Sequence, residues 1–162
     1  LNELIMTQSS PGELLELLNT RLYSLMPRGM FATMFLGIID LECNQLDYAA
    51  AAAASPAPVL ICKDDIILLH TVGYPLGIER AASYETHSIP FEKGDMLFLY
   101  SDALIETANP EGHFLKEEAL IHLLLANKTQ KSHLMIKLIL TYLFANYSQN
   151  LSDDLSLLVV IH

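Results

Sequence analysis

Aspartates stand at the ends of two apolar, strand-like runs of this chain. Asp102 directly follows the run over residues 95–101, and Asp153 and Asp154 directly precede the run over residues 155–162. Carboxylates at the ends of central strands can converge at one edge of a sheet, where their oxygens suit hard cations such as Mg²⁺ and Mn²⁺. Aspartate is also common in turns and caps, because its side chain bonds to the nearby backbone. Spacing alone leaves two interpretations open: a local structural role, which is the commoner, and a divalent-metal site.

The sequence lacks the patterns of several other catalytic sites. It has no glycine-rich phosphate loop and no serine elbow flanked by glycines. None of its six histidines stands at metal-ligand spacing from another, and Cys43 and Cys62 form neither a disulfide framework nor a metal pattern. Catalysis by a nucleophilic serine or cysteine therefore has no support. Because isolated thiols are typical of a reducing compartment, we expect a cytoplasmic protein.

The overall charge narrows the class of protein further. A net charge of −10 over 162 residues argues against a nucleic-acid binder, which neutralises phosphates with Lys and Arg. For the same reason, an anionic substrate would need cations as intermediaries. The longest uncharged window, residues 48–62, contains two prolines and is shorter than the ~20 residues of a membrane-spanning helix. We therefore expect neither nucleic acid nor a membrane as a partner.

The hydrophobic content is high for a single domain. The chain is 52% hydrophobic and 17% charged, against about 25% charged in ordinary soluble domains. Such a chain buries more apolar surface than usual, or it presents an apolar face to another molecule, for example to a second copy of itself in a homodimer. Its length suits one domain over residues 1–162.

The first clear element is a helix that begins at a capping box. Ser10 is a suitable N-cap, Pro11 fits the first helical position, and Glu13 stands three residues after the cap. A proline and a glycine at residues 27 and 29 end the helix. We predict that its buried face is formed by the leucines at helical spacing, which are Leu14, Leu18, Leu22 and Leu25.

The middle of the chain alternates apolar runs with short polar turns, which predicts three β-hairpins. Their strands are expected over residues 31–40 and 46–52, 57–62 and 66–72, and 84–91 and 95–101. Because the runs are apolar on both faces, we expect sheets that are covered on both sides. The alanine run over residues 49–54 predicts close packing against a neighbour.

The spacing of apolar residues then becomes helical, which predicts two helices over residues 115–126 and 131–147. The second helix is apolar nearly all round and is expected to be heavily packed. Residues 155–162 predict one more strand, of the central type. The order of helix, many strands, two helices and strand indicates an α+β domain with antiparallel sheets and helices packed on them.

Six segments resemble those of a known family. In their order and spacing they are similar to the SpoIIE-like serine/threonine phosphatases, the bacterial branch of the metal-dependent, type 2C (PPM) protein phosphatases. The resemblance runs from Pro11 to Val160. It rests on ELLELLNTRLYSL, MFATMFLGIIDLECNQLDYAAA, PAPVLI, GYPLGI, KGDMLFLYSDALIETANPEG and SDDLSLLVV.

This resemblance implies a central antiparallel β-sandwich flanked by helices, of which the chain is the C-terminal part. It also implies two Mn²⁺ or Mg²⁺ ions, held largely by aspartates. Asp102 matches the aspartate of a motif after a strand, Asp153 matches the one that opens the last strand motif, and Asp154 is its neighbour. The metals would activate a water as the nucleophile, so no side chain would attack phosphorus. The loop over residues 108–113 is a candidate substrate flap.

The chain departs from the family pattern in three places. The chain is expected to lack the N-terminal strands and helix of the family, where the other metal-binding aspartates lie. Ala103 replaces the usual glycine after Asp102, and AAAASPAP stands where a Gly-His pair is usual. Since two or three carboxylates bind a hard cation weakly, we expect this chain alone to be weakly active or inactive. Substrate binding is expected at Ala103 and at Gly73 and Gly77, two glycines whose first role is to shape a turn.

Two functions remain open. The resemblance implies a phosphatase module of bacterial signalling that acts on phosphoserine in a small regulator of the anti-anti-sigma type. It also implies a sensor or receiver domain in the parent chain. The alternative is a degenerate, inactive phosphatase fold that recruits a regulatory partner without chemistry. Ala103 and the altered loop favour the alternative, and the three aspartates favour the enzyme.

Overall fold

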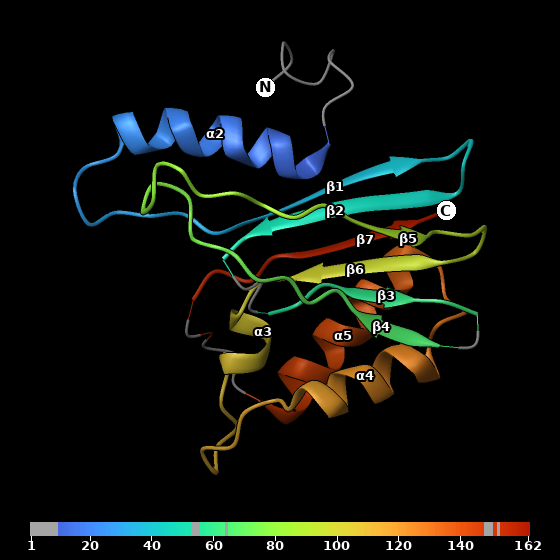
Figure 1. Cartoon of the computed structure of the whole chain (residues 1–162). Helices are drawn as coiled ribbons and strands as arrows, with labels where there is room; N and C mark the ends of the chain where they lie inside the picture. Colours follow the sequence, from blue (N-terminus) through green and yellow to red (C-terminus); the bar gives the residue numbers. More distant parts are fainter. Residues whose placement is uncertain (1–9, 53–55, 64, 148–150, 152) are drawn as a thin grey trace. The chain divides into compact units, whose positions relative to one another are not determined.

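The computed structural model describes residues 10–52, 56–63, 65–147, 151 and 153–162 (Figure 1). The chain forms two compact units, which are described separately. The first unit comprises Leu1–Ala54 and His70–Glu92, and the second comprises Ser55–Leu69 and Lys93–His162. In the described part of the chain, no helix is long and apolar enough to cross a membrane. A single domain over residues 1–162 stays a prediction.

In its described residues, the first unit combines the helix α2 (Pro11–Leu25) with a three-stranded antiparallel sheet. Its strands are β1 (Met34–Asp40), β2 (Gln45–Ala51) and β5 (His87–Pro90), in the order β1-β2-β5. An aspartate closes the β1–β2 turn, because Oδ1 of Asp40 accepts hydrogen bonds from the backbone N–H groups of Glu42 (2.8 Å) and Cys43 (2.9 Å). The first predicted hairpin is confirmed.

The capping box at the start of α2 is also confirmed. The Ser10 Oγ accepts a hydrogen bond from the backbone N–H of Glu13 at 3.4 Å, and the Glu13 carboxylate accepts one from the backbone N–H of Ser10 at 2.8 Å. Pro11 occupies the first turn, where its missing N–H costs no helical bond. Local sequence therefore determines where this helix begins.

The predicted leucine stripe of α2 is right only in part. Leu18 and Leu22 pack against the buried cluster of the first unit, but the buried positions of the helix are Pro11, Gly12, Leu15 and Asn19. Asn19 is fully buried, whereas Leu25 is 78% exposed, and the other three leucines of the stripe are half-buried. Close contacts set the face: a Cβ added to Gly12 would lie 2.1 Å from the carbonyl oxygen of Tyr84. Asn19 donates from Nδ2 to the carbonyl of Glu79 at 2.8 Å. A glycine and an amide carry no apolar signal, so a count of leucines misses these contacts.

The alanines of β2 lie in the core of the first unit. Ala49, Ala50 and Ala51 are at most 2% exposed, and two of them belong to one buried cluster with Leu15 of α2. Small side chains allow the helix and the strand to approach closely, as interior packing requires. The predicted close packing is confirmed for these residues, and positions 53 and 54 lie outside the described residues.

The second unit is a four-stranded antiparallel sheet in the order β4-β3-β6-β7. Its elements are β3 (Val59–Ile61), β4 (Ile66–Leu68), β6 (Met96–Tyr100), α3 (Ala103–Glu106), α4 (Glu117–Ala126), α5 (Ser132–Asn146) and β7 (Leu157–Ile161). Figure 1 shows α4 and α5 together beside this sheet. They bury a shared core, which includes Val59, Ile61, Phe98, Leu120, Leu124, Met135, Ile139 and Leu143.

The predicted pairing is right for the second hairpin and wrong for the third. β3 pairs with β4, as expected. β5, however, pairs with β2 in the sheet of the first unit, whereas β6 pairs with β3 and β7 in the sheet of the second. Two apolar runs and a turn indicate adjacent strands, but the pattern does not identify the partner of each strand. The α+β class with antiparallel sheets is confirmed.

Three elements are less buried than predicted. β7 is the last strand in its sheet order, not a central one, and its Leu158 is 56% exposed. α5 is fully buried only at Met135, Ile139 and Leu143, while β1 exposes Ile38 to 39%. The strands β3 and β6 are therefore covered on both faces, as predicted, but β1 is not. The helix α5 packs along one face only.

Candidate metal centre

Strand register brings the predicted aspartates to one end of the sheet in the second unit. β6 and β7 pair antiparallel, from Met96 opposite Ile161 to Tyr100 opposite Leu157. The chain that leaves β6 toward Asp102 therefore lies beside the chain that enters β7 from residues 153–154. The register therefore places the two segments that carry these aspartates at a common end of the sheet, and an ion shared by their carboxylates stays a prediction.

A serine that the sequence analysis missed links the two acidic segments. Ser101 precedes Asp102, and its backbone N–H donates to the carbonyl of Ser156 at 3.0 Å. Its Oγ donates to the backbone carbonyl of Asp154 at 3.0 Å and accepts from the backbone N–H of Ser156 at 2.9 Å. The sequence does show a Ser-Asp pair after one apolar run and an Asp-x-Ser pattern before the next. Sequence alone, however, does not show that these two patterns are joined by hydrogen bonds.

The carboxylates are exposed and make local hydrogen bonds. Asp102 caps α3, and its Oδ1 accepts from the N–H of Ala103 at 2.9 Å. Oδ1 of Asp153 accepts from the N–H of Asp154 at 2.7 Å. Carboxylate oxygens carry further lone pairs, so these bonds leave metal ligation possible. The same aspartates can therefore both cap the local backbone and bind a metal ion.

The donor set fits part of a metal centre. Exposed carboxylate oxygens are the ligands that Mg²⁺ and Mn²⁺ prefer. Within the described residues, however, no group of three or more His, Cys, Asp or Glu side chains is arranged to hold an ion. A hard cation takes about six oxygen ligands, so a complete centre needs water or further protein groups. Asp102, Asp153 and Asp154 could supply one side of it.

Ala103 fits the local backbone without strain. It is the first residue of α3, and Asp102 before it has right-handed helical angles, φ −56° and ψ −29°. A glycine is therefore not required here for conformational freedom. Its side chain is 1% exposed and its N–H donates to Asp102. Ala103 is thus part of the support of α3, and a role in substrate binding stays a prediction.

Gly73 and Gly77 have structural roles in the first unit. Gly77 has a φ of +88°, and its N–H donates to Oδ1 of Asn19 at 2.8 Å. A Cβ added to it would lie 3.0 Å from the sulfur of Met26, and one added to Gly73 would lie 3.1 Å from the carbonyl oxygen of Ala50. These contacts agree with the turn-shaping role, and substrate binding by either glycine stays a prediction.

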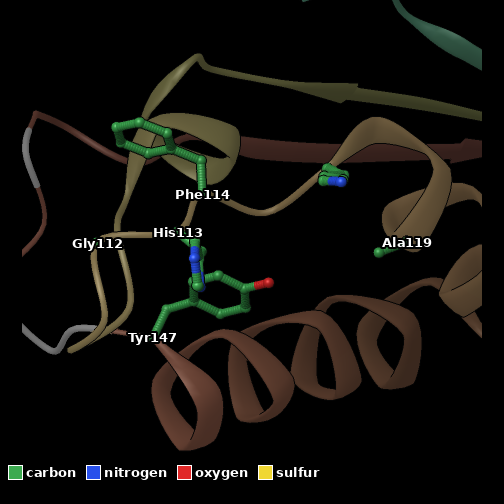
Figure 2. Close-up of a pocket in the computed structure, with 6 residues that line it drawn as sticks. Gly112, His113, Phe114, Ala119 and Tyr147 are labelled. Carbon is green, nitrogen blue, oxygen red and sulfur yellow. The ribbon is translucent and has the colours of Figure 1, made fainter.

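The loop after α3 borders a pocket that sequence reasoning did not find (Figure 2). The pocket has a volume of about 660 Å³ and belongs wholly to the second unit. It is lined by Gly112, His113, Phe114, Lys116, Ala119 and Tyr147. The sequence indicated the loop over residues 108–113, but only the fold brings Tyr147 at the end of α5 to it.

Comparison with known proteins identifies the family. The family model of Stage II sporulation protein E (SpoIIE) matches residues 1–162, so the chain belongs to the SpoIIE family. A relative is "Phosphoserine phosphatase RsbU" of Bacillus subtilis (strain 168), with 30% identity over 151 residues. The match covers 93% of this chain but 44% of RsbU, so the chain spans less than half of that relative.

Solved structures share the fold. The SiaA-PP2C domain of Pseudomonas aeruginosa superimposes with a TM-score of 0.79 at 16% identity, over 94% of this chain and 60% of that one. The phosphatase domain of SpoIIE from Bacillus subtilis, presoaked in Mn, gives a TM-score of 0.63 at 18% identity, over 99% and 70%. The resemblance found in the sequence is thereby confirmed, and so is the PP2C-like α+β fold.

Proposed function

We propose that this chain is the C-terminal part of a metal-dependent serine/threonine phosphatase domain that hydrolyses phosphoserine on a regulatory protein. The observation that carries the proposal is the set of Ser101 hydrogen bonds, which hold the segments of Asp102 and Asp153–Asp154 together at one sheet end. Membership of the SpoIIE family and the similarity to phosphoserine phosphatase RsbU support the chemistry.

In this proposal the aspartates hold one side of a centre for two Mn²⁺ or Mg²⁺ ions. Bound metal of this kind lowers the pKa of a water and offsets charge on the phosphoryl oxygens. The chain itself contributes the ligands and their spacing, which Ser101 fixes. Because the net charge is −10, a phosphate approaches this surface only where cations offset the carboxylates. The exposure of all three aspartates leaves room for a protein-bound phosphoserine.

The family suggests the setting of the reaction. The substrate would be a small phosphoserine regulator of the anti-anti-sigma type, and the parent chain would carry a sensor or receiver domain. The two free thiols, Cys43 and Cys62, fit the reducing cytoplasm. A homodimer would cover part of the exposed apolar surface, such as Leu158.

The test uses the longer protein that contains this chain. Hydrolysis of para-nitrophenyl phosphate and of a phosphoserine peptide is measured with and without Mn²⁺, for wild type, Asp102→Asn and Asp153→Asn. We expect each substitution to lower Mn²⁺-dependent kcat/KM by at least about 100-fold, because each removes a charged ligand.

Asp65→Asn is the matched control for these variants. Asp65 is exposed, and its Oδ1 accepts from the N–H of Ile66 at 2.8 Å, so it makes the same kind of local bond. It lies at the opposite end of the same sheet, because Ile66 pairs with Ile61 and Ile61 with Met96. Equal loss in all three variants would contradict the proposed centre. Absence of Mn²⁺-dependent turnover in the wild type would favour the alternative, a binding module without chemistry.

A further inference from the structure

The pocket beside the loop after α3 has the composition of a binding site for a protein side chain. Phe114 is 57% exposed on one wall, and Tyr147 is half-buried at the C-terminal end of α5 (Figure 2). Its volume of about 660 Å³ lies in the usual range of ligand pockets. Exposed aromatic residues are enriched in interfaces, where they act as anchors.

Hydrogen bonds hold the loop of this pocket in one conformation. Oδ1 of Asn109 accepts from the N–H groups of Glu111 (3.1 Å) and His113 (2.8 Å), and the Asn109 N–H donates to the carbonyl of His113 at 2.8 Å. A β-bridge joins Ala108 to Phe114. The wall that carries Phe114 is therefore pre-formed, so binding there costs little ordering of the loop.

The pocket is within reach of the candidate metal centre. α3 starts directly after Asp102, and the buried Oγ1 of Thr107 donates back to the carbonyl of Ala103 at 2.6 Å. From Asp102 to Thr107 the helical rise spans about 8 Å, and the step to Ala108 and its bridge to Phe114 add about 9 Å. The Cα atoms of Asp102 and Phe114 are thus no more than about 17 Å apart, which an extended peptide covers in about five residues.

The charge of the lining favours an anionic segment. The lining includes the cation Lys116 and the imidazole of His113, while the neighbouring Glu117 and Glu118 are not part of it. In a chain of net charge −10, this cation is complementary to a peptide that carries a phosphate. Apolar contact with Phe114, Ala119 and Tyr147 would supply the larger part of the affinity.

We propose that this pocket binds one apolar side chain of the phosphoprotein substrate, within about five residues of the phosphoserine. The proposal rests on the phosphatase function proposed above. It makes Phe114 and Tyr147 residues that determine specificity, outside the metal centre itself. The pocket would thereby select among phosphoserine proteins by the sequence next to the phosphate.

The experiment uses short phosphoserine peptides of Gly and Ser in which one flanking position at a time carries Leu. The longer protein is assayed for kcat/KM on each peptide relative to the peptide without Leu. We expect Leu at one or two positions to raise kcat/KM about tenfold, equivalent to about 1.4 kcal/mol. Phe114→Ser should abolish this preference, and Phe114→Leu should keep part of it.

Phe144→Ser is the matched control. Phe144 is also a partly exposed phenylalanine, at 38%, but it does not line the pocket, so the preference for Leu should persist. A preference unchanged by Phe114→Ser would overturn the proposal, and so would turnover of para-nitrophenyl phosphate without any preference among the peptides.

If nothing is hydrolysed, the proposed function fails separately. Fluorescence anisotropy of the labelled peptides then tests whether the pocket binds the Leu side chain. About tenfold weaker binding of the Leu peptides by Phe114→Ser than by wild type supports the proposal, and equal binding by the two proteins overturns it.

Discussion

The two ends of the sheet in the second unit use aspartate differently. At one end, Asp102, Asp153 and Asp154 are exposed and their segments are joined through Ser101. At the other end, Asp95 is 5% exposed beside the thiol of Cys62. Burial and, to a smaller extent, the negative charge of Asp95 raise the pKa of this thiol.

The difference shows that residue type alone does not define a metal centre. A buried carboxylate is part of the structure around it, so its loss is expected to affect stability. Carboxylates that remain hydrated, and that backbone pairing holds together, are available to a cation at little additional desolvation cost. Function is therefore predicted at the exposed end, and stability at the buried end.

The largest expected effect is at the buried end. Asp95→Ala should lower the free energy of unfolding by about 2–3 kcal/mol, because it removes a buried side chain together with its hydrogen bond to the half-buried thiol of Cys62. Urea denaturation measures this change. Asp65→Ala, an exposed aspartate at the same end, should cost no more than about 0.5 kcal/mol. Similar losses of stability in the two variants would contradict the contrast between buried and exposed aspartates.

The next effect concerns the serine at the exposed end. Ser101→Ala removes the two hydrogen bonds of the Oγ and should weaken Mn²⁺ binding about tenfold, because the acidic segments lose their fixed spacing. Isothermal titration with Mn²⁺ measures this affinity. Ser101→Thr keeps a hydroxyl and should restore most of it. If Ser101→Thr binds as weakly as Ser101→Ala, the hydroxyl does not position the ligands.

A smaller effect depends on pH at Tyr100, which ends β6 beside this centre. Burial, with a smaller contribution from the charge of Glu117, raises the pKa of Tyr100 to about 12. The folded state therefore holds this proton more tightly than the unfolded state does. The resulting stability is complete below the ordinary pKa of 10.0 and is lost as the pH rises toward about 12.

Tyr100→Phe removes this contribution, so the stability of the variant should fall less steeply above pH 10.0. Urea denaturation at several pH values measures the slope. Near neutral pH the variant should be as stable as wild type or slightly more so, because the buried hydroxyl has no hydrogen-bond partner among the described residues.

The smallest effect is expected at Ala103. Ala103→Gly restores the usual family residue but adds backbone freedom in α3, so it should cost about 0.5–1 kcal/mol of stability. Mn²⁺ affinity should not change, because the N–H that bonds Asp102 is retained. A clear gain in affinity would show that the alanine Cβ obstructs the centre.

Much of the fold was predictable where the signal is local. Ser10 and Glu13 start α2 through bonds across one turn, and the β1–β2 turn is closed by Asp40. The aspartates were found as candidates because each stands directly beside an apolar strand. Such features depend on neighbours in sequence, so the chain specifies them without its tertiary structure.

The misses all depend on distant contacts. Which strand β5 pairs with, which face of α2 is buried and how much of α5 is covered are decided by residues far along the chain. The bonds of Ser101 to Asp154 and Ser156 are of the same kind, since they join positions more than fifty residues apart. The sequence by itself determined most of the elements, their order and the candidate ligands, but not the short helix α3. Only the tertiary structure decided which strand ends meet, because pairing and burial depend on the free energy of the whole fold and not of any segment.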